Sequence, residues 1–257
     1  MSFRRFYYIL FLSSISFQSC AETYFGVLRG NEIIQYKSPY AGIINLHVKN
    51  VGDVDKNKNL FEIESFEYQA KIDIINIKIR RLERNKKHLE RSYEYSRDAY
   101  NSGFIPLRDL QEKKDAISET ELNIKELNIE KKALIHLLQS GNISMERDFI
   151  IRDIYVSQRQ AVNTGDSLIK VETLNKYHID IKFDPVAIKG RIQDKDIKLK
   201  SLVNGFSCSG NVVKITSASS DGNSSSPGLK IATIELNTPD VDMSTLLDTA
   251  FEIIVSD

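Results

Sequence analysis

The chain has no tryptophan, two cysteines and five prolines among its 257 residues, and its formal net charge is zero. If an N-terminal signal peptide that contains Cys20 is removed, or if Cys20 is lipidated, Cys208 has no partner in the mature chain, so no disulfide framework stabilises the protein. Its 35 basic and 35 acidic residues balance, which gives no support for a nucleic-acid partner. Packing and assembly must therefore supply the stability.

The sequence also lacks the patterns of an enzyme or a metalloprotein. Its four histidines are scattered, without the spacing of metal ligands. No glycine-rich phosphate loop of the form GxxxxGK is present, and nothing in the sequence places a nucleophile beside a base. We therefore expect no catalytic residue, no cofactor and no metal site.

No apolar run is long enough to cross a bilayer, which needs about 20 residues. The longest run, residues 6–17, follows Arg4 and Arg5, and this order of charge and then apolar residues is typical of a secretory signal peptide. We predict a signal peptide over residues 1–21, cleaved before Glu22, and a periplasmic mature chain. Lipidation at Cys20 and an uncleaved anchor are the two alternatives.

Two short β-rich segments, residues 43–64 and 151–172, resemble each other weakly. Neither copy is large enough to bury its apolar face alone, so we expect the two to pack on each other. At a constant offset of 108 residues, the matching apolar positions of this predicted pairing core are Leu46, Val48, Val54 and Leu60 in the first copy and Ile154, Val156, Val162 and Leu168 in the second.

The chain between the copies carries apolar residues at alternating steps of four and three, which is the heptad seam of a coiled coil. A helix-breaking segment at residues 101–106, which contains Gly103 and Pro106, separates two such runs. Two helices of roughly 35 residues would form an antiparallel hairpin roughly 50 Å long, because each residue adds about 1.5 Å. A second apolar line, Leu122 and Ile129, lies off this seam and is either a contact with neighbouring subunits or ordinary surface.

The C-terminal part alternates apolar and polar residues, as half-buried strands do. Strands are predicted at residues 178–183, 211–215, 231–236 and 251–255, and a small closed or nearly closed barrel fits them.

This order of elements resembles the periplasmic adaptors of the membrane-fusion-protein (hemolysin D-like) family over nearly the whole mature chain. The resemblance is carried by SPYAGII at residues 38–44, VGDV at 51–54, LFEI at 60–63 and GNVVKI at 210–215. It implies an α+β multidomain fold: a split lipoyl-like β-sandwich, a long antiparallel α-helical coiled-coil hairpin and a C-terminal β-barrel. The implied parts are a signal peptide at 1–21, an approach segment at 22–36, lipoyl-like halves at 37–65 and 143–173, the hairpin at 66–142 and the barrel at 174–257.

The resemblance also implies a function and partners. The chain would link an inner-membrane transporter to a TolC-like outer-membrane channel and would associate into a ring, typically a hexamer. An ABC-type exporter is favoured, because the chain leaves little room after the barrel for the membrane-proximal domain of proton-driven pump adaptors. The hairpin tip would dock on the channel through Arg97, Gly103, Phe104, Ile105, Pro106, Leu107 and Arg108.

The sequence departs from the family pattern in the second lipoyl-like half and at the hairpin tip. Glu146 and Ile150 stand where the second half would carry Pro and Gly, and Asn101 stands where tips of drug-efflux adaptors usually carry Leu. The competing hypothesis is a secreted structural or adhesive coiled-coil protein without a transporter. Under that hypothesis the two β repeats are incidental.

Overall fold

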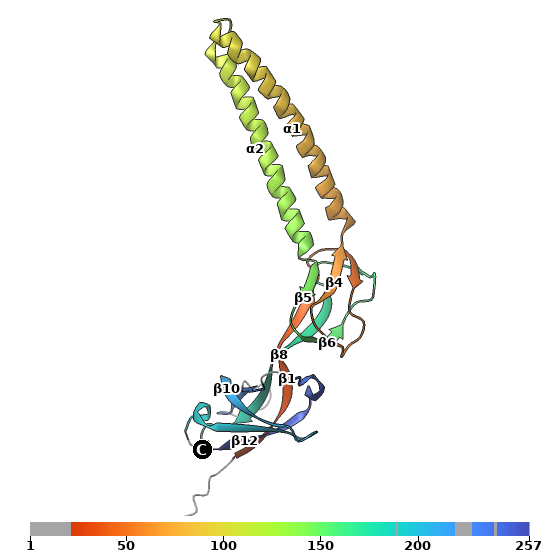
Figure 1. The fold of residues 1–257 in the computed structure, drawn as a ribbon, viewed down its shortest axis with the longest axis vertical. Helices are drawn as coiled ribbons and strands as arrows, with labels where there is room; N and C mark the ends of the chain where they lie inside the picture. Colours follow the sequence, from red (N-terminus) through yellow and green to blue (C-terminus); the bar gives the residue numbers. More distant parts are fainter. Residues whose placement is uncertain (1–21, 189, 219–227, 239–240, 257) are drawn as a thin grey trace, which may run out of the picture. The chain divides into compact units, whose positions relative to one another are not determined.

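The computed structural model describes residues 22–188, 190–218, 228–238 and 241–256. The predicted signal peptide and Cys20 lie outside the described residues. The chain divides into two compact units. We call residues 34–171 the hairpin unit and the remainder, up to residue 33 and from residue 172, the barrel unit (Figure 1).

The barrel unit closes on itself. Its strands follow one another in the order β1, β12, β9, β10, β11 and β8, and β8 pairs again with β1. All the alternating apolar faces therefore point to one interior, where Ile179, Ile234 and Ile253 are fully buried. The strands are β1 (Glu22–Lys37), β8 (Ser167–Phe183), β9 (Asp196–Ser201), β10 (Ser207–Ser217), β11 (Lys230–Leu236) and β12 (Ala250–Ser256), with short 3-10 turns η1 (Ile192–Asp194) and η2 (Ser244–Leu246).

The segment at residues 22–36, expected to be only an approach, is most of strand β1. It pairs antiparallel with β12, Glu22 opposite Val255 and Val27 opposite Ala250. The burial pattern along β1 alternates, as it does in a strand with one face in a core. The first residues that the structure describes therefore complete the barrel with strand β12, near the other end of the chain.

In the hairpin unit, a β-sandwich carries two long helices, which run side by side as an antiparallel hairpin (Figure 1). The elements are β2 (Gly42–Leu46), β3 (Val54–Asp55), β4 (Lys58–Glu64), α1 (Phe66–Asn101), α2 (Leu107–Gln139), β5 (Asn142–Met145), β6 (Phe149–Ile154), β7 (Ala161–Val162) and the start of β8. The predicted α+β fold class is confirmed. None of the described helices combines the length and the apolar character that crossing a membrane requires.

The two β repeats exchange strands. One sheet has the order β5-β4-β2-β7, and in the other β8 is followed by β6 and β3. Strand β7 of the second copy therefore completes the sheet of β2 and β4, and β3 of the first copy completes the sheet of β6 and β8. Each copy has an incomplete sheet without the other, which gives a structural reason for their pairing.

Hydrogen bonds repeat this exchange. The Ile44 N–H donates to the Gln160 carbonyl and the Arg159 N–H to the Ile44 carbonyl. In the other sheet, the Ile151 N–H donates to the Asp53 carbonyl and the Gly52 N–H to the Ile151 carbonyl. The two sets are the same pattern with the copies interchanged, so the copies are related by an approximate twofold axis.

The structure gathers seven of the eight residues of the predicted pairing core. Val48, Leu60, Val162 and Leu168 are buried in one apolar cluster, and Leu46, Ile154 and Val156 are partly buried against it. Val54 is an exception, with 48% of its surface exposed.

The prediction for Val54 is wrong because the repeat offset is not constant. Val54 pairs with Ile150, and the matching pair in the other sheet is Ala161 with Ile43, an offset of 107 residues. Val54 therefore corresponds to exposed Ala161 and not to buried Val162. In a strand, a shift of one residue moves a side chain to the opposite face of the sheet.

Candidate functional site

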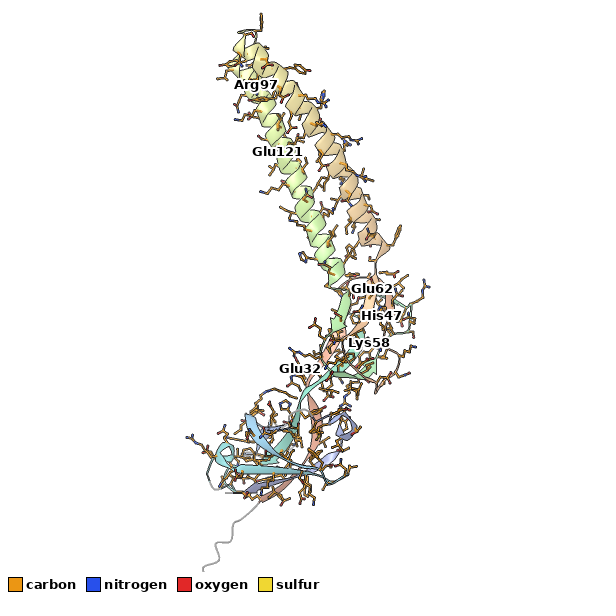
Figure 2. The ribbon with its side chains drawn as sticks, in the orientation of Figure 1. Glu32, His47, Lys58, Glu62, Arg97 and Glu121 are labelled. Carbon is orange, nitrogen blue, oxygen red and sulfur yellow. The ribbon has the colours of Figure 1, made fainter. Side chains whose placement is uncertain are left out.

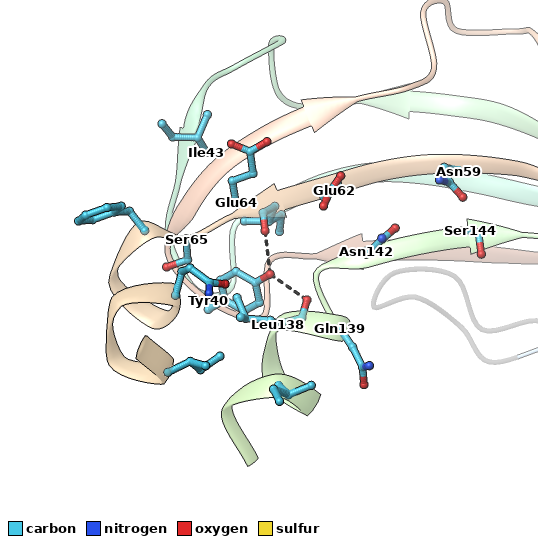
Figure 3. A pocket seen from close by; sticks show the side chains of 15 residues that line it. Tyr40, Ile43, Asn59, Glu62, Glu64, Ser65, Leu138, Gln139, Asn142 and Ser144 are labelled. Atoms are coloured by element: carbon cyan, nitrogen blue, oxygen red, sulfur yellow. Dashed lines mark hydrogen bonds between the residues drawn. The ribbon is translucent and has the colours of Figure 1, made fainter. Parts of the chain in front are cut away.

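The root of the hairpin is held by one buried tyrosine. The Tyr40 hydroxyl lies 2.8 Å from the Ile63 carbonyl oxygen, just before α1, and 3.0 Å from the Leu138 carbonyl oxygen, at the end of α2 (Figure 3). Its ring packs edge-on against the ring of Tyr68 in α1, with centroids 5.5 Å apart. A single side chain therefore connects the beginning and the end of the hairpin to the sandwich.

The return of the chain into the sandwich depends on close packing at Gly141. A β-carbon at this position would lie 2.1 Å from the Tyr40 hydroxyl oxygen. The Gly141 carbonyl accepts a hydrogen bond of 2.9 Å from the Ile63 N–H, and β5 then pairs with β4. The two ends of the hairpin are therefore adjacent, as the packing of the repeats required.

A groove of 1020 Å³ lies beside Tyr40 at this root (Figure 3). Its wall includes the exposed side chains of Ile43 and Phe66 and the carboxylates of Glu62 and Glu64. Burial is the main cause that raises the pKa of Tyr40, and the nearby Glu62 carboxylate adds to the effect. The Tyr40 hydroxyl is therefore a neutral hydrogen-bond donor at physiological pH.

Along the hairpin, the predicted seam faces inward. Ile72, Ile75 and Ile79 of α1 and Leu110 and Thr120 of α2 are buried. Lys86 occupies a seam position that has no apolar side chain, and it forms an ion pair of 2.7 Å with Glu121 across the two helices. The pair places Lys86 and Glu121 level with each other, but both side chains are partly exposed to water, so it adds little to the stability of the hairpin.

The tip is a tight turn closed by a Schellman motif. The Phe104 N–H donates to the Ala99 carbonyl and the Gly103 N–H to the Tyr100 carbonyl, at 2.9 Å each. Gly103 has φ of +78°, a conformation that a residue with a side chain adopts only with strain. Pro106 then precedes α2 in an extended conformation, so the chain reverses within a few residues.

This turn presents apolar side chains to solvent. Phe104 is 83% exposed and Leu107 is 61% exposed, while Ile105 is half-buried. Arg97, near the far end of the hairpin in Figure 2, lies 3.8 Å from the Asp98 carboxylate, and Arg108 lies 3.5 Å from that of Glu112. These exposed pairs are weak, so both guanidinium groups remain available to a partner.

The described residues contain no group of three or more His, Cys, Asp or Glu side chains arranged to hold a metal ion. Cys208, on β10, is a partly buried free thiol, and burial raises its pKa to about 11. This thiol is protonated at neutral pH and is a poor nucleophile.

Sequence reasoning placed the seam and the tip but missed the role of Tyr40. Tyr40 was visible only as part of the SPYAGII stretch, and no local pattern shows that its hydroxyl reaches residues 23 and 98 positions away. The burial of Thr120 in α2 follows from its seam position alone, because its hydroxyl bonds locally to the Ala116 carbonyl.

No family model matches the sequence. No curated protein matches it either. Solved structures do match. MacA from Actinobacillus actinomycetemcomitans has a TM-score of 0.73 at 18% identity, covering 93% of this chain and 78% of that one. The membrane fusion protein Spr0693 from Streptococcus pneumoniae R6 has a TM-score of 0.69 at 11% identity, covering 91% of this chain and 98% of that one.

A third match is ZneB from Cupriavidus metallidurans, with a TM-score of 0.55 at 12% identity, covering 92% of this chain and 98% of that one. The sequence identities are low, so these matches concern the fold. They extend over the sandwich, the hairpin and the barrel together and not over one common module. The chain therefore has the fold of the membrane fusion proteins, the periplasmic adaptors of efflux systems.

Proposed function

We propose that this chain is a periplasmic adaptor, which links an inner-membrane exporter to a TolC-like outer-membrane channel. The proposed role is mechanical and not enzymatic. The sandwich and the barrel would form the assembly near the inner membrane, and the hairpin would reach the channel. A hairpin of about 50 Å suits this bridging role, since its length follows from the helical rise.

The observation that carries the proposal is the exposed apolar turn at the end of the hairpin. Phe104 and Leu107 are among the more exposed large apolar side chains described, and no other described part of the chain covers them. Such residues at the end of a stiff arm favour a contact with another protein. Arg97 and Arg108 beside them would add hydrogen bonds to carbonyl or carboxylate groups of the channel.

The remaining parts of the proposal follow the family resemblance. Copies of the chain would associate into a ring, a hexamer by resemblance, because repetition of one interface around an axis closes a conduit. The transporter would be ATP-driven and would export a peptide or a small protein, with small-molecule efflux as the alternative. Cys20 would be removed with the signal peptide or would carry a lipid anchor.

Photo-cross-linking from position 105 tests the proposal. A benzophenone amino acid replaces Ile105, cells are irradiated, and the captured protein is identified by mass spectrometry. The expected product is an outer-membrane channel. The matched control carries the same probe at Lys125, on the shaft of α2, and should not capture the channel. Capture of an extracellular matrix component or of no envelope protein would favour the adhesive coiled-coil hypothesis instead.

The cargo is tested by deleting the gene of this chain. Loss of an exported peptide from the medium, with unchanged drug sensitivity, is the expected result. Increased sensitivity to small molecules with normal peptide export would favour drug efflux. Mass spectrometry of the mature N-terminus distinguishes a free Glu22 from a lipidated Cys20.

A further inference from the structure

The outer edge of α1 carries a line of residues, all exposed except the half-buried Ala70, that the hairpin does not use. Each helical residue turns by about 100°, so this line lies on the side of α1 opposite the buried seam of Ile72, Ile75 and Ile79. At its base, Phe66, Ile74 and Ile77 are 88%, 53% and 59% exposed. The whole line is Phe66, Ala70, Ile74, Ile77, Arg81, Arg84, His88, Arg91 and Tyr95.

The outer edge of α2 carries a second line, which points away from α1. Its apolar members, Leu122 and Ile129, are 56% and 60% exposed. The whole line is Asp115, Glu119, Leu122, Glu126, Ile129 and Ala133. Large apolar side chains therefore lie on both lateral edges of the hairpin, and none of the residues that the structure describes covers either edge.

The two edges carry opposite charge. The line on α1 contains three arginines and no acidic residue, and the line on α2 contains three acidic residues and no basic one. Within the part of the chain that the structure describes, the ion pairs of the helices involve other residues, so Arg81, Arg84 and Glu126 make none.

The two edges also match in height along the hairpin. The ion pair between Lys86 and Glu121 shows that these two residues are level. Arg81 lies five residues closer to the root of the hairpin than Lys86 on α1, and Glu126 lies five residues closer to the root than Glu121 on α2. Arg81 and Glu126 are therefore level too. By the same counting, the positions of Ile77 and Ile129 along the hairpin axis differ by one residue, which is about 1.5 Å.

We propose that the outer edge of α1 in one copy packs against the outer edge of α2 in a second copy, with the two hairpins parallel and level. Ile77 then contacts Ile129 of the neighbour, and Arg81 pairs with Glu126 of the neighbour. The contact is heterologous, since the two surfaces differ, and its repetition builds a ring of hairpins. This inference rests on the proposed ring and names the surfaces that form it on the shaft.

An isologous contact is disfavoured by the same residues. Two α1 edges facing each other would bring their arginines together, and two α2 edges would bring their carboxylates together. Like charges opposite one another are destabilising, whereas the α1-to-α2 arrangement places an arginine at the level of a glutamate.

Disulfide cross-linking in cells tests the contact. Full-length chains carry Cys208→Ser together with either Ile77→Cys or Ile129→Cys. After mild oxidation, co-expression of the two variants should give a cross-linked dimer, whereas each variant alone should give none. Lys78→Cys, which lies off the line at almost the same height, replaces Ile77→Cys as the matched control and should cross-link poorly. A dimer formed by Ile77→Cys alone would overturn the proposal in favour of an isologous contact.

Charge exchange supplies the second test. Arg81→Glu in the copy with Ile77→Cys should lower the dimer yield about tenfold, the change that roughly 1.4 kcal/mol produces. Glu126→Arg in the copy with Ile129→Cys should restore it. Failure of cross-linking in cells where position 105 still captures the channel would overturn this contact and leave the adaptor function standing. Cross-linking of the two hairpins without capture of a channel from position 105 would support this contact and contradict the adaptor function.

Discussion

The two β repeats of the hairpin unit make the same hydrogen bonds with different residues. Ile44 and Ile151 occupy equivalent positions, both are fully buried, and each exchanges two backbone hydrogen bonds with the other copy. The turns that follow are less alike. Gly52 has φ of +90° in the first copy, and its counterpart Arg159 has φ of +60° in the second. The fold thus keeps the backbone path and the apolar positions, and it tolerates a change of residue type at a turn.

A second difference between the repeats concerns the hairpin root. The first copy, extended to its lipoyl-like half at residues 37–65, supplies Tyr40, whose hydroxyl contacts both ends of the hairpin. The positions 107 and 108 residues later are Arg147 and Asp148, so the second copy supplies no equivalent. Attachment of the hairpin through this hydroxyl therefore depends on the first copy alone.

Truncation of the equivalent isoleucines should have the largest effect. Ile44→Ala and Ile151→Ala should each lower the free energy of unfolding by about 3 kcal/mol, because both leave a cavity in the same core. Val54→Ala, in a neighbouring strand, should change it by less than about 0.5 kcal/mol, since Val54 faces solvent. Urea unfolding followed by circular dichroism measures all three. Equal losses at Val54 and Ile44 would contradict the register described above.

Gly52→Val should have the next largest effect, a loss of about 2 kcal/mol. No atom lies within 4 Å of the β-carbon position, so the loss comes from the left-handed backbone and not from a clash. Gly52→Asn is the matched variant and should lose less, because asparagine adopts this conformation more readily. The secreted coiled-coil hypothesis, in which the repeats are incidental, expects no effect of either variant on the helices.

Tyr40→Phe should lower the free energy of unfolding by about 1 kcal/mol, because a carbonyl oxygen at the root loses its donor. Burial raises the pKa of Tyr40 in the folded chain. Its contribution to stability is therefore complete below about pH 10, the pKa in the unfolded chain, and is lost as the pH rises above that value. Thermal unfolding between pH 8 and pH 11 should show a smaller alkaline decline in Tyr40→Phe than in the parent.

The smallest effect is expected at the second turn. Arg159→Gly relieves the left-handed strain of a residue with a side chain, but glycine loses more conformational freedom on folding. The two contributions oppose each other, so the free energy of unfolding should stay within about 0.5 kcal/mol of the parent value. A large destabilisation by Arg159→Gly would show that the arginine side chain is needed for the turn.

The helical seam could be predicted almost residue by residue. Heptad spacing is local, and the buried positions Ile72, Ile75, Ile79 and Leu110 follow directly from it. The residues of the tip were also predictable as a turn from Gly103 and Pro106. What could not be predicted was β1, because pairing with β12, more than 200 residues away, decides that the segment is a strand. Strand formation depends on such distant partners more than helix formation does.

The sequence by itself determined the spacing of apolar residues in each element, the place of the tip and the presence of two copies of one β motif. These features depend only on residues close together in the chain. Only the tertiary structure decided which faces of the two copies meet. The exchange of β3 and β7 between the two sheets sets an offset of 107 there, and one residue of register turns Val54 from the core to the solvent. It also decided that the Tyr40 hydroxyl contacts both ends of the hairpin, since that contact joins segments far apart in the chain.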